Sequence, residues 1–451
     1  MSIRTFLIKQ MLYPISDVLR GTRIVSKYNF LLKSQWWDKE KLEKYQNNKL
    51  KILIHHSYEN VDYYKRLFKV NNLKPNDIRT KDDLLKIPPL TKKIVRKFAT
   101  TSLVANNIPK RRILMGRTGG STGEPLQFYR DKNSKSWGIG GLYRFWNWSG
   151  LDFAEKKFQL SGGSLGGFLT NKSKLYLKLD KFLTGSYLLP AFEIYEKNLD
   201  RYLYLIESNK NIRFLRGYPS TIFILARHIN KNGINRIRFN SVLTTAENLY
   251  DFQKKEIQKA FSCPIFDQYG CGEILSIAAQ CEKGNLYHIM DEHIILETNS
   301  NIKNNVARIT DLDNFASPFI RYENGDIIKP TEKACECGRN LDCISNIEGR
   351  THDFITTPDG SLIAGEFFPH LFQSIKGIDQ YFIFQQSINH LIVSVKPNEY
   401  FSQEELDLYI NKIEEYVGEK VTIEIKIVDE IPLTQSGKRL FVKSNISLKM
   451  D

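Results

Sequence analysis

Two kinds of hydrophobic pattern follow one another along the chain. Apolar residues recur at helical spacing through "SQWWDKEKLEKYQNNKLKILIHHSYENVDYYKRLF", which predicts amphipathic helices. Further on, short segments typical of strands, such as "FQLSGG", "SVLTTAE" and "PIFDQYG", alternate with helix-like segments. In "RFLRGYPSTIFILARHINKNG", Pro219 suits the first turn of a helix and Gly233 lies just past its end. Strands that alternate with helices predict an α/β fold with layered, mostly parallel sheets.

The pattern changes in the last part of the chain. From "GRTHDF" onward it predicts a smaller α+β unit, with a hairpin in "FITTPDGSLI", a helix in "SQEELDLYINKIEEYVGE" and a strand in "VTIEIKIVDEI". The turn of the hairpin is Asp359-Gly360. We therefore predict an N-terminal domain over residues 1–349 and a C-terminal domain over residues 350–451. The second domain, of about 100 residues, falls in the usual size range.

The net charge of the chain favours anionic binding partners but does not identify one. The 451 residues carry a formal net charge of +15, with lysines spread along the chain. A diffuse basic excess favours nucleotides, CoA-like molecules, nucleic acid or an acidic membrane surface, although a solvated lysine-rich surface explains it equally well. The opening "MSIRTFLIKQMLYPI" is too short and interrupted for a signal peptide or a membrane span, and no later apolar run reaches spanning length. We expect a soluble, cytoplasmic protein with no transmembrane segment.

The stretch "GRTGGSTGEPLQFYRD" concentrates glycine and hydroxyl residues before a predicted strand. Its glycines let the backbone approach a ligand closely and turn N–H groups toward it, and its hydroxyls add donors. The spacing is not that of the common phosphate loop, which ends in lysine. The alternative is an ordinary glycine-serine turn between strands. The residues concerned are Thr118, Gly119, Gly120, Ser121, Thr122 and Gly123.

Four later segments offer charged side chains to a ligand. Glu273 follows a predicted strand in "FDQYGCGEI", where ligands bind in α/β sheets and where a carboxylate can hold Mg²⁺ beside phosphates. Asp326 follows a turn in "RYENGD" and suits a ribose diol, while Arg350 adjoins the predicted domain junction. Lys438 lies in the turn of "IPLTQSGKRLF". Each also has a plain interpretation as a solvated turn acid or a surface cation.

In this order the motifs resemble the adenylate-forming enzyme superfamily. The matching stretches are "TGGSTGEP", "TTAE", "DQYGCGE", "RYENGD", "GRTHDF" and "PLTQSGK". More narrowly the chain resembles the phenylacetate–CoA ligase family, and within it the CapK-type members associated with bacterial surface polysaccharide. The resemblance covers nearly the whole length, because the opening helices also match. It implies the fold of these enzymes, with a large N-terminal domain and a small mobile C-terminal domain.

The resemblance also implies how ATP is bound. The glycine-rich loop cradles the β- and γ-phosphates, "TTAE" lines the adenine site, and Tyr269 packs near the nucleotide. Asp326 binds the ribose hydroxyls, with Arg350 close to the same sugar. The full set of implied ATP-binding residues is Thr118, Gly119, Gly120, Ser121, Thr122, Gly123, Ala246, Glu247, Tyr269, Asp326 and Arg350.

Catalysis is implied to depend on Lys438 and Glu273. Glu273 reaches Mg²⁺, and Lys438 bridges the attacking carboxylate and the α-phosphate. Mg²⁺ and Lys438 would offset the repulsion between two anions and the charge that develops at the α-phosphorus. The C-terminal domain rotates between two half-reactions about a hinge that maps to Asp353. A fixed two-domain body is the alternative.

The cysteines raise a separate metal question. Cys335 and Cys337 form a tight pair followed by glycine, and Cys281 and His288 lie upstream, so three thiolates and one imidazole can form a closed structural zinc site. Some relatives in the phenylacetate–CoA ligase family carry zinc at comparable positions. The alternative is a set of reduced, unliganded thiols. In this scheme Cys343 is a spare, Cys271 lies in the pocket wall, and His293 is an alternative ligand.

The sequence does not identify the carboxylic acid or the acceptor of the acyl group. We expect the acyl pocket around Tyr218, Pro219 and Gly270, with Trp137 as a neighbour. The segment "FITTPDGSLIAGEFFPH" departs from the CoA-ligase pattern, so the acceptor is CoA, a carrier-protein thiol, or a sugar amine or hydroxyl. Alternatives to surface-polysaccharide synthesis are an aryl-acid CoA ligase of aromatic catabolism and a basic protein that binds nucleotide or nucleic acid without catalysis. Because basic and aromatic residues form no RNA-binding motif, we expect no nucleic-acid partner.

Overall fold

The computed structural model describes residues 3–117, 126–161, 174–190, 199–297, 305–350, 354–359, 362–364, 367–372, 375–418, 420–432 and 440–446. Its helices are α1 (Ile3–Leu7), η1 (Ile8–Leu12), α2 (Tyr13–Arg20), α3 (Ile24–Ser34), α4 (Lys39–Asn60), α5 (Asp62–Val70), η2 (Pro75–Asp77), η3 (Lys81–Lys86), α6 (Lys92–Phe98), η4 (Lys110–Arg112), α7 (Lys132–Trp148), α9 (Lys174–Thr184), α10 (Leu199–Glu207), α11 (Pro219–Lys231), α12 (Asp251–Phe261), α13 (Phe367–Phe372) and α14 (Gln403–Val417).

Its strands are β1 (Leu90–Thr91), β2 (Ile113–Arg117), β3 (Gln127–Asp131), β4 (Lys157–Ser161), β5 (Ser186–Pro190), β6 (Phe214–Gly217), β7 (Ser241–Thr245), β8 (Ile265–Tyr269), β9 (Ala278–Gln280), β10 (Tyr287–Ile289), β11 (Ile294–Glu297), β12 (Val306–Asp311), β13 (Tyr322–Pro330), β14 (Cys343–Arg350), β15 (Phe354–Thr356), β16 (Leu362–Ala364), β17 (Ile378–Ser387), β18 (His390–Pro397), β19 (Thr422–Ile427) and β20 (Val442–Ser444).

A 12-stranded sheet forms the centre of the large unit, in the order β11-β12-β13-β14-β10-β9-β8-β7-β6-β4-β5, with β1 beside β13. Strands β5, β4, β6, β7 and β8 run parallel. From β8 through β9, β10, β14, β13 and β12 to β11, every neighbour is antiparallel. The predicted α/β class is therefore confirmed. The sheet is mixed, however, and not mostly parallel as predicted.

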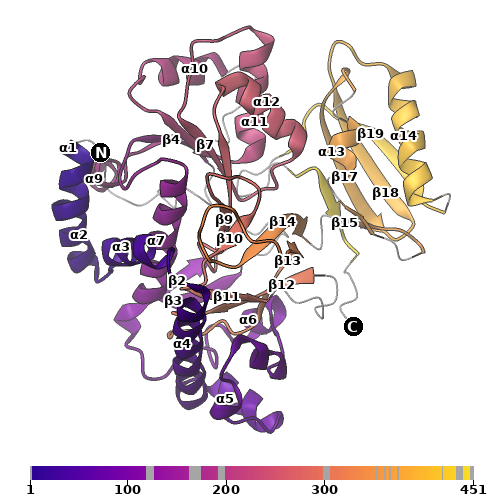
Figure 1. Ribbon diagram of the computed structural model, residues 1–451. Helices are drawn as coiled ribbons and strands as arrows, with labels where there is room; N and C mark the ends of the chain where they lie inside the picture. Colours follow the sequence, from indigo (N-terminus) through magenta and orange to yellow (C-terminus); the bar gives the residue numbers. More distant parts are fainter. Residues whose placement is uncertain are drawn as a thin grey trace.

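The parallel half follows from the alternating pattern of strands and helices. All four residues of β6 and all five of β7 are buried, as expected for strands covered on both faces. Helices α10, α11 and α12 gather over this half (Figure 1), and their apolar sides share one core cluster with the strands. Pro219 is the first residue of α11, and Gly233 follows the helix in a left-handed conformation. Both capping predictions are confirmed.

The antiparallel half is covered by helices from the beginning of the chain. Leu53 and Phe68, from α4 and α5, belong to the same buried cluster as Phe319 and Tyr322 near the start of β13. The hydroxyl of Tyr64 donates to the carbonyl of Pro318 at 2.8 Å across a separation of 254 residues. The opening helices therefore hold residues that adjoin the site described below.

The C-terminal unit has its own core, formed by a four-stranded sheet in the order β19-β18-β17-β20 together with α13 and α14. Figure 1 shows it to one side of the large unit, with α14 on the outer face of its sheet. Ser402 caps α14 by accepting from the backbone N–H of Glu405. The predicted hairpin forms, because Phe354 pairs with Ala364 in an antiparallel ladder. The boundary at residues 349/350, which coincides with the end of β14, stays a prediction.

Candidate functional site

A cluster of three polar side chains joins the parallel and antiparallel halves of the sheet. The hydroxyl of Tyr269, at the C-terminal end of β8, donates to Asp326 Oδ2 at 2.9 Å. The amide of Asn324 donates to the same Asp326 oxygen at 2.6 Å and to the Tyr269 hydroxyl at 2.8 Å. Because β9, β10 and β14 lie between β8 and β13, the sheet curves to make this contact. Two donors on one oxygen fix the orientation of the Asp326 carboxylate.

Glu273 lies in the turn that follows β8. It is buried, and its Oε1 accepts from the hydroxyl of Tyr322 at 2.6 Å. Burial, followed by the charge of Glu273, raises the pKa of Tyr322 well above its ordinary value. The phenol therefore stays protonated and acts as a donor. The carboxylate that we predicted to hold Mg²⁺ is thus oriented by β13, the strand that carries Asp326.

Backbone geometry explains the glycine in this turn. A Cβ atom on Gly270 would lie 2.2 Å from the carbonyl oxygen of Leu275, so no other residue fits without a shift of the backbone. The turn is closed by a hydrogen bond of 2.8 Å from Cys271 N to Ile274 O. Burial raises the pKa of the Cys271 thiol well above its ordinary value, and Glu273 adds to the effect. Cys271 is accordingly a neutral residue of the turn.

Residues predicted to bind substrate or adenine also follow the neighbouring strands β6 and β7. Tyr218 is fully buried and precedes α11, which begins at Pro219. Glu247 Oε2 accepts from the backbone N–H of Ser220 at 3.1 Å, where the helix dipole favours a negative charge. Ala246 has a φ of 71°, which is unusual for a residue with a side chain. The "TTAE" segment is therefore held against the start of α11.

Arg350 is brought beside Asp326 by strand pairing. The register of β13 and β14 places Asp326 opposite Arg350. The sequence prediction that both residues serve the same sugar is compatible with this pairing.

Other predicted residues fall outside the described part of the chain. These are the hinge Asp353, the catalytic Lys438, and the phosphate-loop residues Thr118, Gly119, Gly120, Ser121, Thr122 and Gly123. The strands that flank this loop are described. Arg117 at the end of β2 pairs with Gln127 at the start of β3 in an antiparallel ladder.

Arg130 is a residue that sequence reasoning missed. It lies on β3, and its Nη1 is 3.5 Å from the carbonyl oxygen of Gly272 in the turn that carries Glu273. A cation therefore lies between the hairpin and this turn. The role of the arginine in "LQFYRD" could not be recognised from the sequence, because its partner is 142 residues away.

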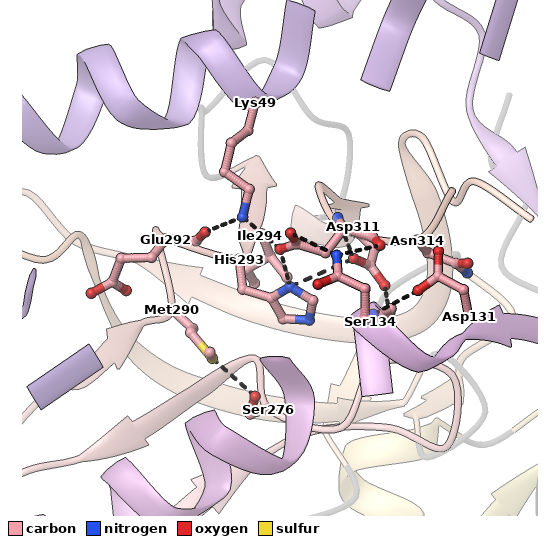
Figure 2. Close-up of polar contacts among 12 residues, drawn as sticks. Lys49, Asp131, Ser134, Ser276, Met290, Glu292, His293, Ile294, Asp311 and Asn314 are labelled. Atoms are coloured by element: carbon pink, nitrogen blue, oxygen red, sulfur yellow. Dashed lines mark hydrogen bonds and ion pairs between the residues drawn. The ribbon is translucent and has the colours of Figure 1, made fainter. Parts of the chain in front are cut away.

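A buried polar network anchors the base of this hairpin (Figure 2). Asp131, the last residue of β3, accepts from the backbone N–H of Ser134 at 2.8 Å and from that of Phe315 at 3.0 Å. The hydroxyl of Ser134 donates to Asp311 Oδ2 at 2.8 Å, at the end of β12. The start of α7, the end of β3 and the end of β12 are thereby fixed to one another.

His293 and Trp137 belong to the same network. His293 Nδ1 lies 2.8 Å from Asp313 Oδ2, which also accepts from Lys49 Nζ at 2.5 Å. The ring of Trp137 stacks on His293 with centroids 6.0 Å apart, and the ammonium groups of Lys27 and Lys49 lie over it. His293 therefore has carboxylate neighbours and is not an alternative ligand in the cysteine cluster. Trp137 is buried and packs within this network, and its assignment beside the acyl pocket stays a prediction.

The four predicted zinc ligands do come together. One ligand atom from each of Cys281, His288, Cys335 and Cys337 lies within 4.8 Å of the others. Cys281 Sγ is 3.6 Å from Cys335 Sγ, and Cys337 Sγ is 3.3 Å from His288 Nε2. Burial lowers the pKa of His288 to about 4, so its imidazole is neutral and can bind a metal. On the opposite side of the ring, Cys343 Sγ lies 3.4 Å from Nδ1.

Residues 355–445 match the family model of the CapK C-terminal domain. The chain is 24% identical to Protein CapK of Staphylococcus aureus over 408 residues, which cover 89% of each chain. It is 25% identical to the phenylacetate-coenzyme A ligase of Thermus thermophilus over 339 residues, 70% of this chain and 72% of that protein. Among solved structures, it superposes on a 2-hydroxyisobutyryl-CoA ligase in the postadenylation state with a TM-score of 0.71. That match has 16% identity and covers 92% of this chain and 93% of the other.

Proposed function

We propose that this chain, a relative of Protein CapK and of the phenylacetate-coenzyme A ligases with the fold of adenylate-forming enzymes, activates a carboxylic acid with ATP. A carboxylate oxygen attacks the α-phosphorus, and the bond to pyrophosphate breaks. In a second step an acceptor attacks the acyl carbon and AMP leaves. The observation that carries the proposal is the Tyr269–Asn324–Asp326 cluster, which lies with Glu273 at the C-terminal end of β8.

The geometry suits the proposed role of each acidic residue. The Asp326 carboxylate is oriented by two donors on Oδ2, as a group that grips a ribose diol requires. Glu273 Oε1 is held by Tyr322, and a single carboxylate together with substrate phosphates is a common way of holding Mg²⁺. When bound, Mg²⁺ would offset charge on the phosphates. Glu247 and Ala246, next to the start of α11, would line the adenine.

Lys438 would supply the charge that the glycine-rich loop lacks. In the proposed first step its ammonium group lies between the carboxylate and the α-phosphate, where negative charge builds up. The C-terminal unit has its own core, which is compatible with movement as a body about Asp353. That movement would withdraw Lys438 for the second step.

The acceptor is a thiol of CoA or a carrier protein, or a sugar amine or hydroxyl. Protein CapK is the relative with the greater coverage, and we therefore favour a role in surface-polysaccharide synthesis. An aryl-acid CoA ligase of aromatic catabolism is the second candidate. The named phenylacetate-coenzyme A ligase, similar over 70% of this chain, favours it.

The experiment that tests the reaction is ATP–pyrophosphate exchange by the whole chain with Mg²⁺ across a panel of carboxylic acids. We expect exchange that requires one acid class and stops without Mg²⁺. Acyl transfer is then measured with the acid that supports exchange, using CoA and a hydroxylamine trap in parallel. Binding of ATP without exchange across a broad panel would instead indicate a nucleotide-binding protein and would overturn the proposal.

We also propose that Cys281, His288, Cys335 and Cys337 hold a structural zinc ion. Three thiols and a neutral imidazole match the donor set of closed tetrahedral sites. Bound zinc would cross-link β10 with the segments that hold the cysteines. Cys343, beside His288 Nδ1, would orient the imidazole.

Cys337→Ser is expected to reduce zinc from about one ion per chain to a small fraction of that, and to lower the unfolding temperature by several degrees. Metal content is measured by elemental analysis after dialysis in metal-buffered solution. Cys263→Ser is the matched control, because Cys263 is a partly buried thiol in another core cluster. Wild-type protein without stoichiometric zinc would refute the site, as would full zinc retention by Cys337→Ser.

A further inference from the structure

The helical segment that runs from α1 through η1 to α2 carries apolar residues on its outer face. It spans Ile3 to Arg20 without a break in helical backbone, about 27 Å at the usual rise. Its exposed apolar residues recur every three or four positions, with Gln10 as the one exposed polar residue among them. We call this set the outer stripe: Ile3, Phe6, Leu7, Met11, Leu12, Ile15, Val18 and Leu19.

The opposite face of the same segment fixes its orientation. Ile8 and Tyr13 are buried in a cluster with Tyr28, Tyr143 and Phe153. Arg4 donates to the carbonyl of Ala154 at 2.8 Å. The outer stripe therefore faces outward because the inner face is packed. Figure 1 places α1 and α2 at the edge of the large unit farthest from the C-terminal unit.

The surroundings of the outer stripe are basic. Residues 1–34 contain six basic side chains and one acidic side chain, and that acid, Asp17, is buried and accepts from Thr22 and Val25. A groove of about 620 Å³ runs beside the stripe between α2 and α3. Lys9, Arg23 and Lys33 line it together with Val18, so the groove joins the stripe. Cations and exposed apolar side chains thus share one surface.

Helix α9 extends this surface. Phe182 is exposed, and the guanidinium of Arg4 lies over its ring at 5.3 Å. Leu179, one turn earlier, is also exposed. Lys178 and Lys181 are exposed on the same helix, which also carries one acid, the partly buried Asp180. A second element therefore repeats the combination of apolar and basic side chains.

We propose that the outer stripe binds the surface of an anionic membrane, with the helical segment lying in the plane of the interface. A helix with an apolar face and basic flanks is suited to insert among acyl chains while its cations contact anionic headgroups. Within the described ranges, no helix is both long and apolar enough to cross a bilayer, so the contact is peripheral. This inference is independent of the proposed reaction.

Charge argues for a membrane and against a second copy of this chain. Two copies joined through their outer stripes would bring two basic surfaces together, because Lys9, Arg23 and Lys33 line the groove beside each stripe while Asp17, the one acid in residues 1–34, is buried. Anionic lipid neutralises the same cations and covers the apolar residues.

Co-sedimentation of the whole chain with vesicles tests the proposal. We expect binding to vesicles of phosphatidylglycerol and phosphatidylcholine, at least tenfold weaker binding to phosphatidylcholine alone, and loss of binding as salt rises. Val18→Glu/Leu19→Glu is expected to weaken binding at least tenfold. Val18 and Leu19 are 80% and 82% exposed, so we expect their substitution to leave the fold intact.

Val70→Glu/Leu408→Glu is the matched control, because it adds the same charge at residues that are 81% and 63% exposed on other elements. It should bind vesicles within about twofold of wild type. Absence of binding to phosphatidylglycerol vesicles would overturn the proposal, as would equal binding by both variants. A dimer in analytical ultracentrifugation that Val18→Glu/Leu19→Glu alone dissociates would also overturn it, in favour of self-association.

Discussion

Lys438→Ala is expected to slow ATP–pyrophosphate exchange by about two to three orders of magnitude while the dissociation constant of ATP changes little. In the proposed reaction this ammonium group acts where the carboxylate attacks the α-phosphate, so its contribution is greatest in the transition state. Loss of one donor at such a position costs about 10²–10³ in rate. ATP itself would still be held by the glycine-rich loop, Asp326 and Mg²⁺.

Exchange with the preferred acid gives the rate, and calorimetric titration with ATP gives the affinity. Lys426→Ala is the matched control, because Lys426 lies on β19 of the same C-terminal unit, is half exposed and pairs with Glu424. Its exchange rate should remain within about twofold of wild type, as expected for an exposed pair. Exchange near the wild-type rate in Lys438→Ala would show that the assigned role is wrong, without refuting acid activation.

Arg144→Met should lower the free energy of unfolding by about 3–5 kcal/mol. Arg144 and Glu292 form an ion pair of 2.7 Å in which both side chains are fully buried. The substitution leaves the Glu292 carboxylate in the core with the hydroxyl of Ser34 as a donor at 2.6 Å. The uncompensated charge, and not the lost contact, causes most of the effect. Urea denaturation followed by tryptophan fluorescence measures it.

A double-mutant cycle separates the charge from the packing. Because Arg144 Nε, Arg144 Nη2 and Glu292 Oε2 find no hydrogen-bond partner among the described residues, the pair is incompletely satisfied. Arg144→Met/Glu292→Leu should therefore regain most of the stability that Arg144→Met loses. Arg236→Met removes one partner of an exposed pair with Glu207 and should cost less than about 1 kcal/mol. If the double variant were as unstable as Arg144→Met, packing and not charge would explain the loss.

The parallel half of the sheet was predictable because each of its strands and helices can be recognised from a short stretch of sequence. Strands β6, β7 and β8 are short, mostly buried segments separated by helices, one of which has clear ends at Pro219 and Gly233. Strands β9 and β10 have three residues each, too few for a period to be recognised. Their antiparallel pairing depends on partners as distant as β14, and the mixed character of the sheet escaped prediction for that reason.

In the candidate site, too, features set by nearby residues were predictable and features set by distant partners were not. Tyr269, Glu273 and Asp326 could be proposed as site residues from the sequence because short motifs contain them. The donors that orient them, Asn324 and Tyr322, lie in the same "RYENGD" stretch, but their roles depend on side chains 55 and 49 residues away. The cluster of Cys281, His288, Cys335 and Cys337 was predictable from residue type alone. Strand pairing explains part of its assembly, since β10 places His288 opposite Ala279 of β9, and Cys281 directly follows β9.

The packing of α5 on the chain near residue 318 has a consequence for biosynthesis. Tyr64 and its partner Pro318 are 254 residues apart, so at about 5–20 residues per second the ribosome needs roughly 13 to 50 s to produce the second after the first. Throughout that interval the apolar side of α5, which includes Phe68, lacks Phe319 and Ile320 as neighbours. The nascent chain is therefore prone to aggregation at this helix, and a chaperone that covers it would raise the yield of folded protein.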